Sequence, residues 1–111
     1  MTNLSGAETT TESLIAEALG PYSSRPDTIG LARLINDLIT CGSDLHRQVS
    51  AIPKTDRTYR AIGALADWDY ASAAGPRGTG DPAHWNHARG LARVIQNLIR
   101  ALAAYSPAST L

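Results

Sequence analysis

The stretch IGLARLINDLITCGSDLHRQVSAI, residues 29–52, decides the fold of this chain. Its apolar and small residues recur at steps of three and four for about six turns, a spacing that only an α-helix brings onto one face. Asp27 or Thr28 can cap the start of this helix, and Pro53 ends it because a proline disfavours the helical conformation of the residue before it. The residues of the apolar face are Leu31, Leu34, Ile35, Leu38, Cys41, Gly42, Leu45, Val49 and Ile52.

Gly42 lies in the middle of this helix, where glycine costs roughly 1 kcal/mol relative to alanine. A glycine on an apolar face leaves room for a neighbouring backbone or ring. We therefore expect another helix to approach closely at Gly42.

Three further helices are expected around this one. A short helix follows Thr9 as N-cap, with Glu12 as its capping-box partner, and Gly20-Pro21 ends it. The apolar face of this short helix consists of Leu14, Ile15, Ala18 and Leu19. A second helix begins at Thr55 or Asp56 and ends before the glycine-rich loop at 74–81. Its expected apolar stripe is Tyr59, Ile62, Leu65, Ala66, Trp68 or Asp69, and Ala73.

The last helix is expected to begin at Asp81-Pro82, an N-cap followed by a proline in the first helical position. It runs to about Tyr105, before Ser106-Pro107. Its apolar face consists of Trp85, Ala88, Leu91, Ala92, Ile95, Leu98, Ile99 and Leu102. We expect the helices at 28–52 and 82–105 to pack antiparallel, with 56–73 laid across them.

The sequence therefore predicts an all-α fold, a small helical bundle of three main helices plus a short N-terminal helix. A chain of 111 residues has room for one core, and 43% hydrophobic residues suffice to build it. We expect one helical domain at 13–105, between a flexible N-terminus at 1–12 and a flexible tail at 106–111.

Composition excludes several classes of partner. Ten basic and ten acidic residues cancel, so the basic surplus of a nucleic-acid binder is missing and nucleic acid is not expected as a partner. No apolar run approaches the ~20 residues of a membrane span, and the N-terminus lacks the pattern of a signal peptide. With Cys41 as the single cysteine, no intrachain disulfide can form, and we expect a cytoplasmic protein without membrane contact.

The residue types that carry chemistry do not form a recognisable constellation. His84 and His87 share a helical face near Asp81, but two histidines are not a metal-ligand set, and we expect no metal and no cofactor. Asp67 and Asp69 lie two apart on a helix and point in different directions, so they form no catalytic dyad. The free thiol of Cys41 fits a buried position better than a nucleophile.

Two other sequence features have similarly plain interpretations. The GPRGTGDP loop lacks the lysine and the preceding strand of a phosphate loop. The pairs Arg57 with Arg60 and Arg89 with Arg93 could meet phosphate, but fit solvated faces better.

The order of the segments LARLINDLI, RAIGALADW and HARGLARVIQNLIRAL resembles a family of short actinobacterial proteins of unknown function, over about residues 28–105. The shared positions are mostly apolar spacing, with the His87-Ala88-Arg89 and Leu91-Ala92-Arg93 triplets. The resemblance implies an all-helical fold, and it implies no activity or catalytic residue.

The leading hypothesis is a non-enzymatic protein–protein interaction or regulatory accessory module, because chemistry motifs are missing while the helices carry surplus apolar surface. We expect a homodimer with Ile39 and Val94 at the contact, or alternatively contact through Leu14, Ile15 and Leu19 of the short helix. The alternative hypothesis is a small enzyme or ligand-binding protein with a pocket between helices. The expected lining residues of that pocket are His46, Trp68, Trp85 and His87. A DNA-associated regulator is a third and weaker hypothesis, because no helix-turn-helix spacing is present.

Overall fold

The computed structural model describes residues 10–105, and every regular element in this range is helical, which confirms the all-α class. Residues 1–9 and 106–111, which include the expected cap Thr9 and the expected flexible tail, lie outside the described residues. The elements are α2 (Thr11–Ala18), the 3₁₀ turn η1 (Tyr22–Ser24), α3 (Thr28–Ser50), the 3₁₀ turn η2 (Lys54–Asp56), α4 (Tyr59–Ala74) and α5 (Gly80–Ala104). Because α2 begins at Thr11, the helical part starts two residues before the expected boundary at 13.

Short polar side chains cap α2, α3 and α4. Thr10, Asp27 and Thr58 each accept a hydrogen bond from the backbone N–H three residues on, at 2.8 to 3.1 Å. Each cap satisfies one of the N–H groups that a helix start leaves without a partner. Asp27 was one of the two expected caps of α3, whereas Thr10 rather than Thr9 caps α2.

Two expected helix starts were wrong by a few residues. The helix after Pro53 begins at Tyr59 rather than at Thr55 or Asp56. The side chain of Arg57 donates to the carbonyls of Ile52 and Ser50 at 3.0 and 2.7 Å. These hydrogen bonds stabilise the turn after α3, and the next helix begins only beyond Arg57.

The last helix begins at Gly80, one residue before its expected cap, Asp81. The carboxylate of Asp81 does not cap its own helix but accepts a hydrogen bond from Thr28 Oγ1 at 3.1 Å, and Arg25 Nε lies 3.7 Å from it. This contact joins the first turn of α5 to the first turn of α3.

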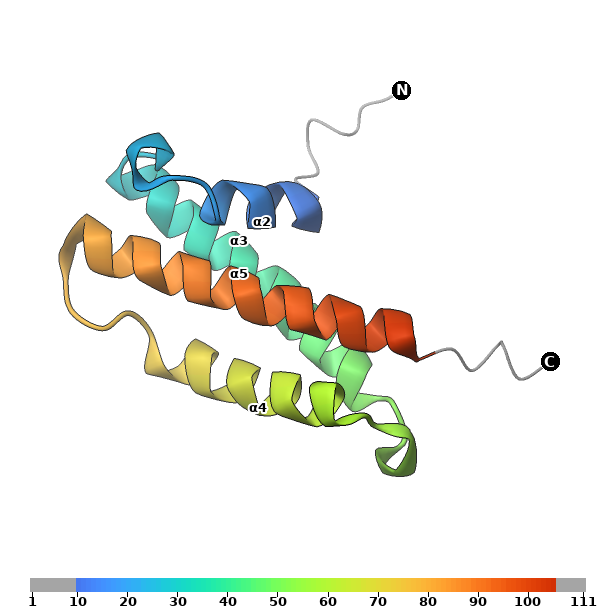
Figure 1. Ribbon diagram of the computed structural model, residues 1–111. Helices are drawn as coiled ribbons and strands as arrows, with labels where there is room; N and C mark the ends of the chain where they lie inside the picture. Colours follow the sequence, from blue (N-terminus) through green and yellow to red (C-terminus); the bar gives the residue numbers. More distant parts are fainter. Residues whose placement is uncertain (1–9, 106–111) are drawn as a thin grey trace, which may run out of the picture.

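The first turns of α3 and α5 therefore lie together, and both helices run in the same general direction (Figure 1). The expected antiparallel packing of these two helices was wrong. The physical reason is connectivity, because α4 returns the chain between them and so the helices before and after it point the same way.

Helix α5 packs against α2, α3 and α4, and α2 and α4 lie on opposite sides of it (Figure 1). The short helix α2 docks through Leu14 and Ile15, which are buried, so this face is already used within the chain. The largest fully buried side chains are Leu31, Leu38, Val49, Leu91, Ile95 and Leu98. They come from the two long stripes that the sequence predicts.

The expected stripe of α4 was wrong in part. The face that packs inward carries Ala61, Ala64 and Trp68, which are buried, and Leu65, which is half-buried. Tyr59, Ile62, Ala66 and Ala73, which were expected inside, are exposed. Helix α4 has apolar residues nearly all round, so their spacing alone could not decide which face is buried.

Candidate functional site

Trp68 is a packing residue between α3 and α4. Its indole lies directly over Gly42, where an added Cβ would be 2.0 Å from the nearest ring carbon. The expected close approach at Gly42 is therefore made by a tryptophan ring, and Trp68 is 3% exposed. A side chain held in this way is part of the core and leaves no room for a ligand on its ring face.

His46 lies one turn beyond Gly42 on α3 and reaches the same neighbouring helix. Its Nε2 is 3.0 Å from Asp69 Oδ1 of α4, and the carboxylate is mostly solvated. The pair joins the polar rims of two helices above the buried Trp68.

Trp85 is buried at the other end of the molecule, near the start of α5. The ring of Tyr22 meets it edge-on with centroids 6.5 Å apart, and the guanidinium of Arg25 lies 3.8 Å from the centroid of Tyr22. Together with Asp81, these residues fix the connection between α2 and α3 to the start of α5. Trp85 thus closes one end of the core.

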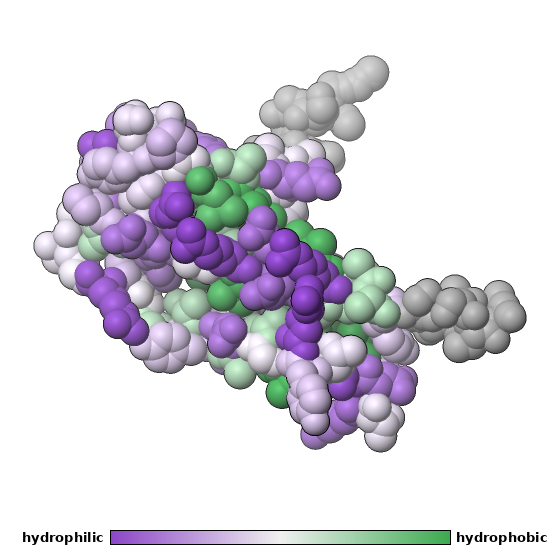
Figure 2. Space-filling view, viewed as in Figure 1, coloured by the Kyte–Doolittle hydropathy of each residue, from purple (hydrophilic) through white to green (hydrophobic). Residues whose placement is uncertain are grey.

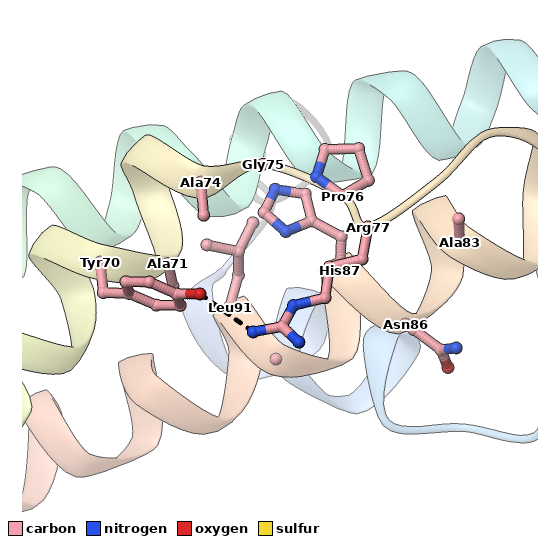
Figure 3. A pocket seen from close by; sticks show the side chains of 11 residues that line it. Tyr70, Ala71, Ala74, Gly75, Pro76, Arg77, Ala83, Asn86, His87 and Leu91 are labelled. Carbon is pink, nitrogen blue, oxygen red and sulfur yellow. Dashed lines mark hydrogen bonds between the residues drawn. The ribbon is translucent and has the colours of Figure 1, made fainter.

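His87 lines a pocket of about 270 Å³ between the C-terminal end of α4, the loop after it and α5 (Figure 3). Arg77 donates to the phenolic oxygen of Tyr70 at 2.9 Å on one side of this pocket. Burial and, to a smaller extent, the neighbouring His84 lower the pKa of His87, so its imidazole favours the neutral form. A neutral imidazole can both donate and accept a hydrogen bond.

The structure thus separates the four expected pocket residues. His87 lines the pocket between α4 and α5, and Trp85 lies along a shallow depression with Tyr22 and Arg89. His46 and Trp68 lie at the α3–α4 contact and line neither space. Each of these two pockets thus contains one of the four expected residues, and the single ligand site lined by all four stays a prediction.

Three of the other sequence candidates, Arg57, Arg89 and Cys41, have structural partners. Arg57 and Arg89 bind backbone carbonyls, with Arg89 reaching Gly20 O at 2.8 Å after the end of α2. Cys41 is half-buried and accepts a weak hydrogen bond from Thr11 Oγ1 at 3.6 Å. Within residues 10–105, no three His, Cys, Asp or Glu side chains come together as a possible metal site.

Three of the five exposed large apolar side chains in residues 10–105 lie on the outer face of α4, which the sequence interpretation assigned to the core. Tyr59 is 93% exposed, Tyr70 63% and Ile62 51%. At 3.6 residues per turn, the exposed uncharged residues of α4 fall within an arc of about 120°. They are Tyr59, Ile62, Gly63, Ala66, Tyr70, Ala73 and Ala74, and we call them the α4 face.

The charged residues of α4 border this face. Arg60 and Asp67 lie on the flank toward α5, and Asp69 lies on the flank toward α3, where it meets His46. Among residues 10–105, no side chain forms an ion pair or hydrogen bond with Arg60 or Asp67. A solvated helix face normally carries charges at its centre, and here they stand only at its borders.

Outside α4, Tyr22 and Ile29 are the exposed large apolar side chains in residues 10–105, and the other large apolar side chains are buried or half-buried. A hydrophobic band follows the line where α2 meets α5 (Figure 2), but its residues Ile15, Leu19 and Ile99 are buried or half-buried against the core. Ile39 and Val94, the expected dimer contacts, are likewise half-buried and packed on the core. The α4 face is therefore the stronger candidate for a contact with another molecule.

Comparison with known proteins gave no match: no protein-family model fits the chain, and no curated protein or solved structure is significantly similar to it. The resemblance to a family of short actinobacterial proteins therefore stays a prediction. Among the helices in residues 10–105, none combines the length and the apolar character needed to cross a membrane.

Proposed function

We propose that this protein is a non-enzymatic protein–protein interaction module in a regulatory or accessory role. In this proposal a small helical bundle, three main helices plus a short N-terminal helix, forms a homodimer through the α4 face. The observation that carries the proposal is that this face exposes Tyr59, Ile62 and Tyr70 on one side of a helix with no charge among them. The cytoplasm is the proposed location, because a single cysteine can form no intrachain disulfide and so does not point to an oxidising compartment.

Two further observations support a binding role over catalysis. Trp68 and Trp85 are used in packing, and the three histidines lie on different parts of the molecule or face different partners. The inward face of α4 is formed largely by alanine, and its larger apolar side chains apart from Trp68 and Leu65 point outward. Exposed tyrosines are among the residues that interfaces favour.

The direct test is the mass of the protein in solution, measured by sedimentation equilibrium over a range of micromolar concentrations. We expect a monomer–dimer equilibrium, and Ala66→Glu should shift it to monomer because it places a charge in the centre of the α4 face. Ala66 is exposed and glutamate is a good helix former, so the variant should keep its fold.

Ala32→Glu is the matched control, because Ala32 is an equally exposed helical alanine on α3, outside the α4 face. It should leave the dimer unchanged. A wild-type protein that stays monomeric throughout would refute the homodimer, and equal loss in both variants would show that the contact is elsewhere.

A second candidate function is the binding of a small molecule in the pocket beside His87. The favouring observation is a neutral imidazole in a pocket that also holds the Arg77–Tyr70 pair. A thermal-shift screen of small polar compounds tests it, with His87→Ala as the control that should abolish any stabilisation. Stabilisation that persists in the control would place the ligand elsewhere.

A further inference from the structure

Arg60 and Asp67 carry opposite charges at a spacing that suits the pairing of two α4 helices. They lie seven residues apart, two turns of helix, so they share a flank of α4 about 10 Å apart along its axis. One is basic, the other is acidic, and both are exposed without an ionic partner in residues 10–105. A second copy of the same helix offers the complementary charges at the same separation.

We propose that two copies pair through antiparallel α4 helices, related by a two-fold axis that passes between Gly63 and Ala64. This inference rests on the homodimer proposed above and defines its register. This axis is perpendicular to both helices, so the flank with Arg60 and Asp67 lies on the same side of the pair in both copies. Arg60 of each copy then lies level with the partner's Asp67, and the contact forms twice.

The apolar residues fit the same register. Tyr59 of each copy lies level with the gap between the partner's Ala66 and the partner's Tyr70, so its ring can pack beside the small side chain of that alanine. Gly63 lies beside the axis, where the helices come closest, and apart from the adjoining turns of its own helix no atom lies within 4 Å of the place a Cβ would take. Small residues at a helix crossing allow a close approach of the two backbones.

A parallel pairing is disfavoured by the same charges. A two-fold axis along the helices would bring the flank with Asp67 against the flank with the partner's Asp69, at nearly the same height. Two carboxylates would then face each other, and Arg60 would lie about two and a half turns from the nearest acid of that flank. Like charges set opposite each other act against the wrong pairing.

The test reverses the charge of Arg60 and the charge of Asp67 in two separate variants. Arg60→Glu and Asp67→Arg should each weaken the homodimer about tenfold or more, because each variant replaces two attractive pairs by two repulsive ones. Both substitutions suit a helix, since glutamate is favourable in the first turn and arginine has a higher helix propensity than aspartate. Circular dichroism should therefore show that both variants stay folded.

An equimolar mixture of the two variants provides the decisive measurement. In a heterodimer, Glu at position 60 faces Arg at position 67, and the original Asp67 faces the original Arg60, so both pairs are attractive again. We expect heterodimers close to wild-type affinity, detected by native mass spectrometry with one variant labelled with ¹⁵N. Arg93→Glu, an exposed reversal on α5, should leave dimerisation unchanged.

The outcomes separate this inference from the homodimer itself. A monomeric wild-type protein would refute both proposals. A dimeric wild-type protein whose two variants dimerise normally, or whose mixture forms no preferred heterodimer, would refute the antiparallel register and leave the homodimer standing.

Discussion

Replacing Gly42 with alanine should destabilise the fold, although the same replacement within a helix usually stabilises it. Alanine gains about 1 kcal/mol over glycine in a helix interior. At Gly42 the new Cβ would lie 2.0 Å from the indole of Trp68, and two more ring carbons lie at 2.4 Å. The ring would have to move until these distances reach at least 3.4 Å, the lower end of ordinary contact.

The size of the destabilisation depends on where the indole ring of Trp68 can move. Trp68 is 3% exposed, so it must either distort its neighbours or leave the core. Overpacking costs typically 1–3 kcal/mol, and losing a buried tryptophan costs ~3–5 kcal/mol. After subtraction of the helix-propensity gain of about 1 kcal/mol, a ring that leaves the core gives a loss of about 2–4 kcal/mol in the free energy of unfolding, and we expect this loss for Gly42→Ala because the contacts of 2.0 and 2.4 Å are too short for a small shift to relieve.

Urea denaturation followed by far-ultraviolet circular dichroism measures this change, at one fixed protein concentration because a dimer makes stability concentration-dependent. Gly90→Ala is the matched control, since apart from the adjoining turns of α5 no atom lies within 4 Å of its Cβ position, and it should stabilise. In a Trp68→Leu background, Gly42→Ala should cost far less. A Gly42→Ala protein as stable as the wild type would refute the packing of Trp68 against Gly42.

Three further predictions concern the core, the pocket histidine and metal. Leu38→Ala and Leu98→Ala should each cost about 2–5 kcal/mol in urea denaturation, because both side chains are 0% exposed, and small losses would mean that the two stripes do not meet. The pKa of His87 is lowered in the folded protein, so the unfolded chain binds its proton more tightly and stability is lost as the pH falls below the usual histidine value of about 6.5. His87→Gln should flatten that part of the curve of melting temperature against pH, and an unchanged curve would contradict the lowered pKa. A chelator should leave the melting temperature unchanged, whereas a metal-to-chain ratio near one in elemental analysis would overturn the expectation that no metal is bound.

The long helices could be predicted from the sequence because the spacing of their apolar residues fits only one buried face. Leu31, Leu34 and Leu38 repeat at helical spacing opposite charged residues, so one face must turn inward. Asp27 and Pro53 mark the ends of that helix through local chemistry alone. The apolar spacing and the two end signals depend only on residues close together in the sequence, so the sequence alone predicts them correctly.

The features that were missed depend on residues far apart in the chain. The burial of Trp68 against Gly42 requires the register between two helices, which no local pattern gives. The α4 face escaped prediction because Tyr59 and Ile62 fit an apolar stripe as well as Ala61 and Ala64 do. Asp81 has the signature of an N-cap, but its carboxylate is used by Thr28, 53 residues earlier.

The central position of α5 has a consequence for how the chain folds as it is made. A ribosome completes α2, α3 and α4 before it makes the helix that packs against all three. Until α5 leaves the exit tunnel, Leu31 and Leu38 lack the side chains of Leu91, Ile95 and Leu98 with which they form the core. The nascent chain therefore passes through a stage in which its longest apolar stripe is open to chaperones, and it closes only after synthesis has passed residue 104.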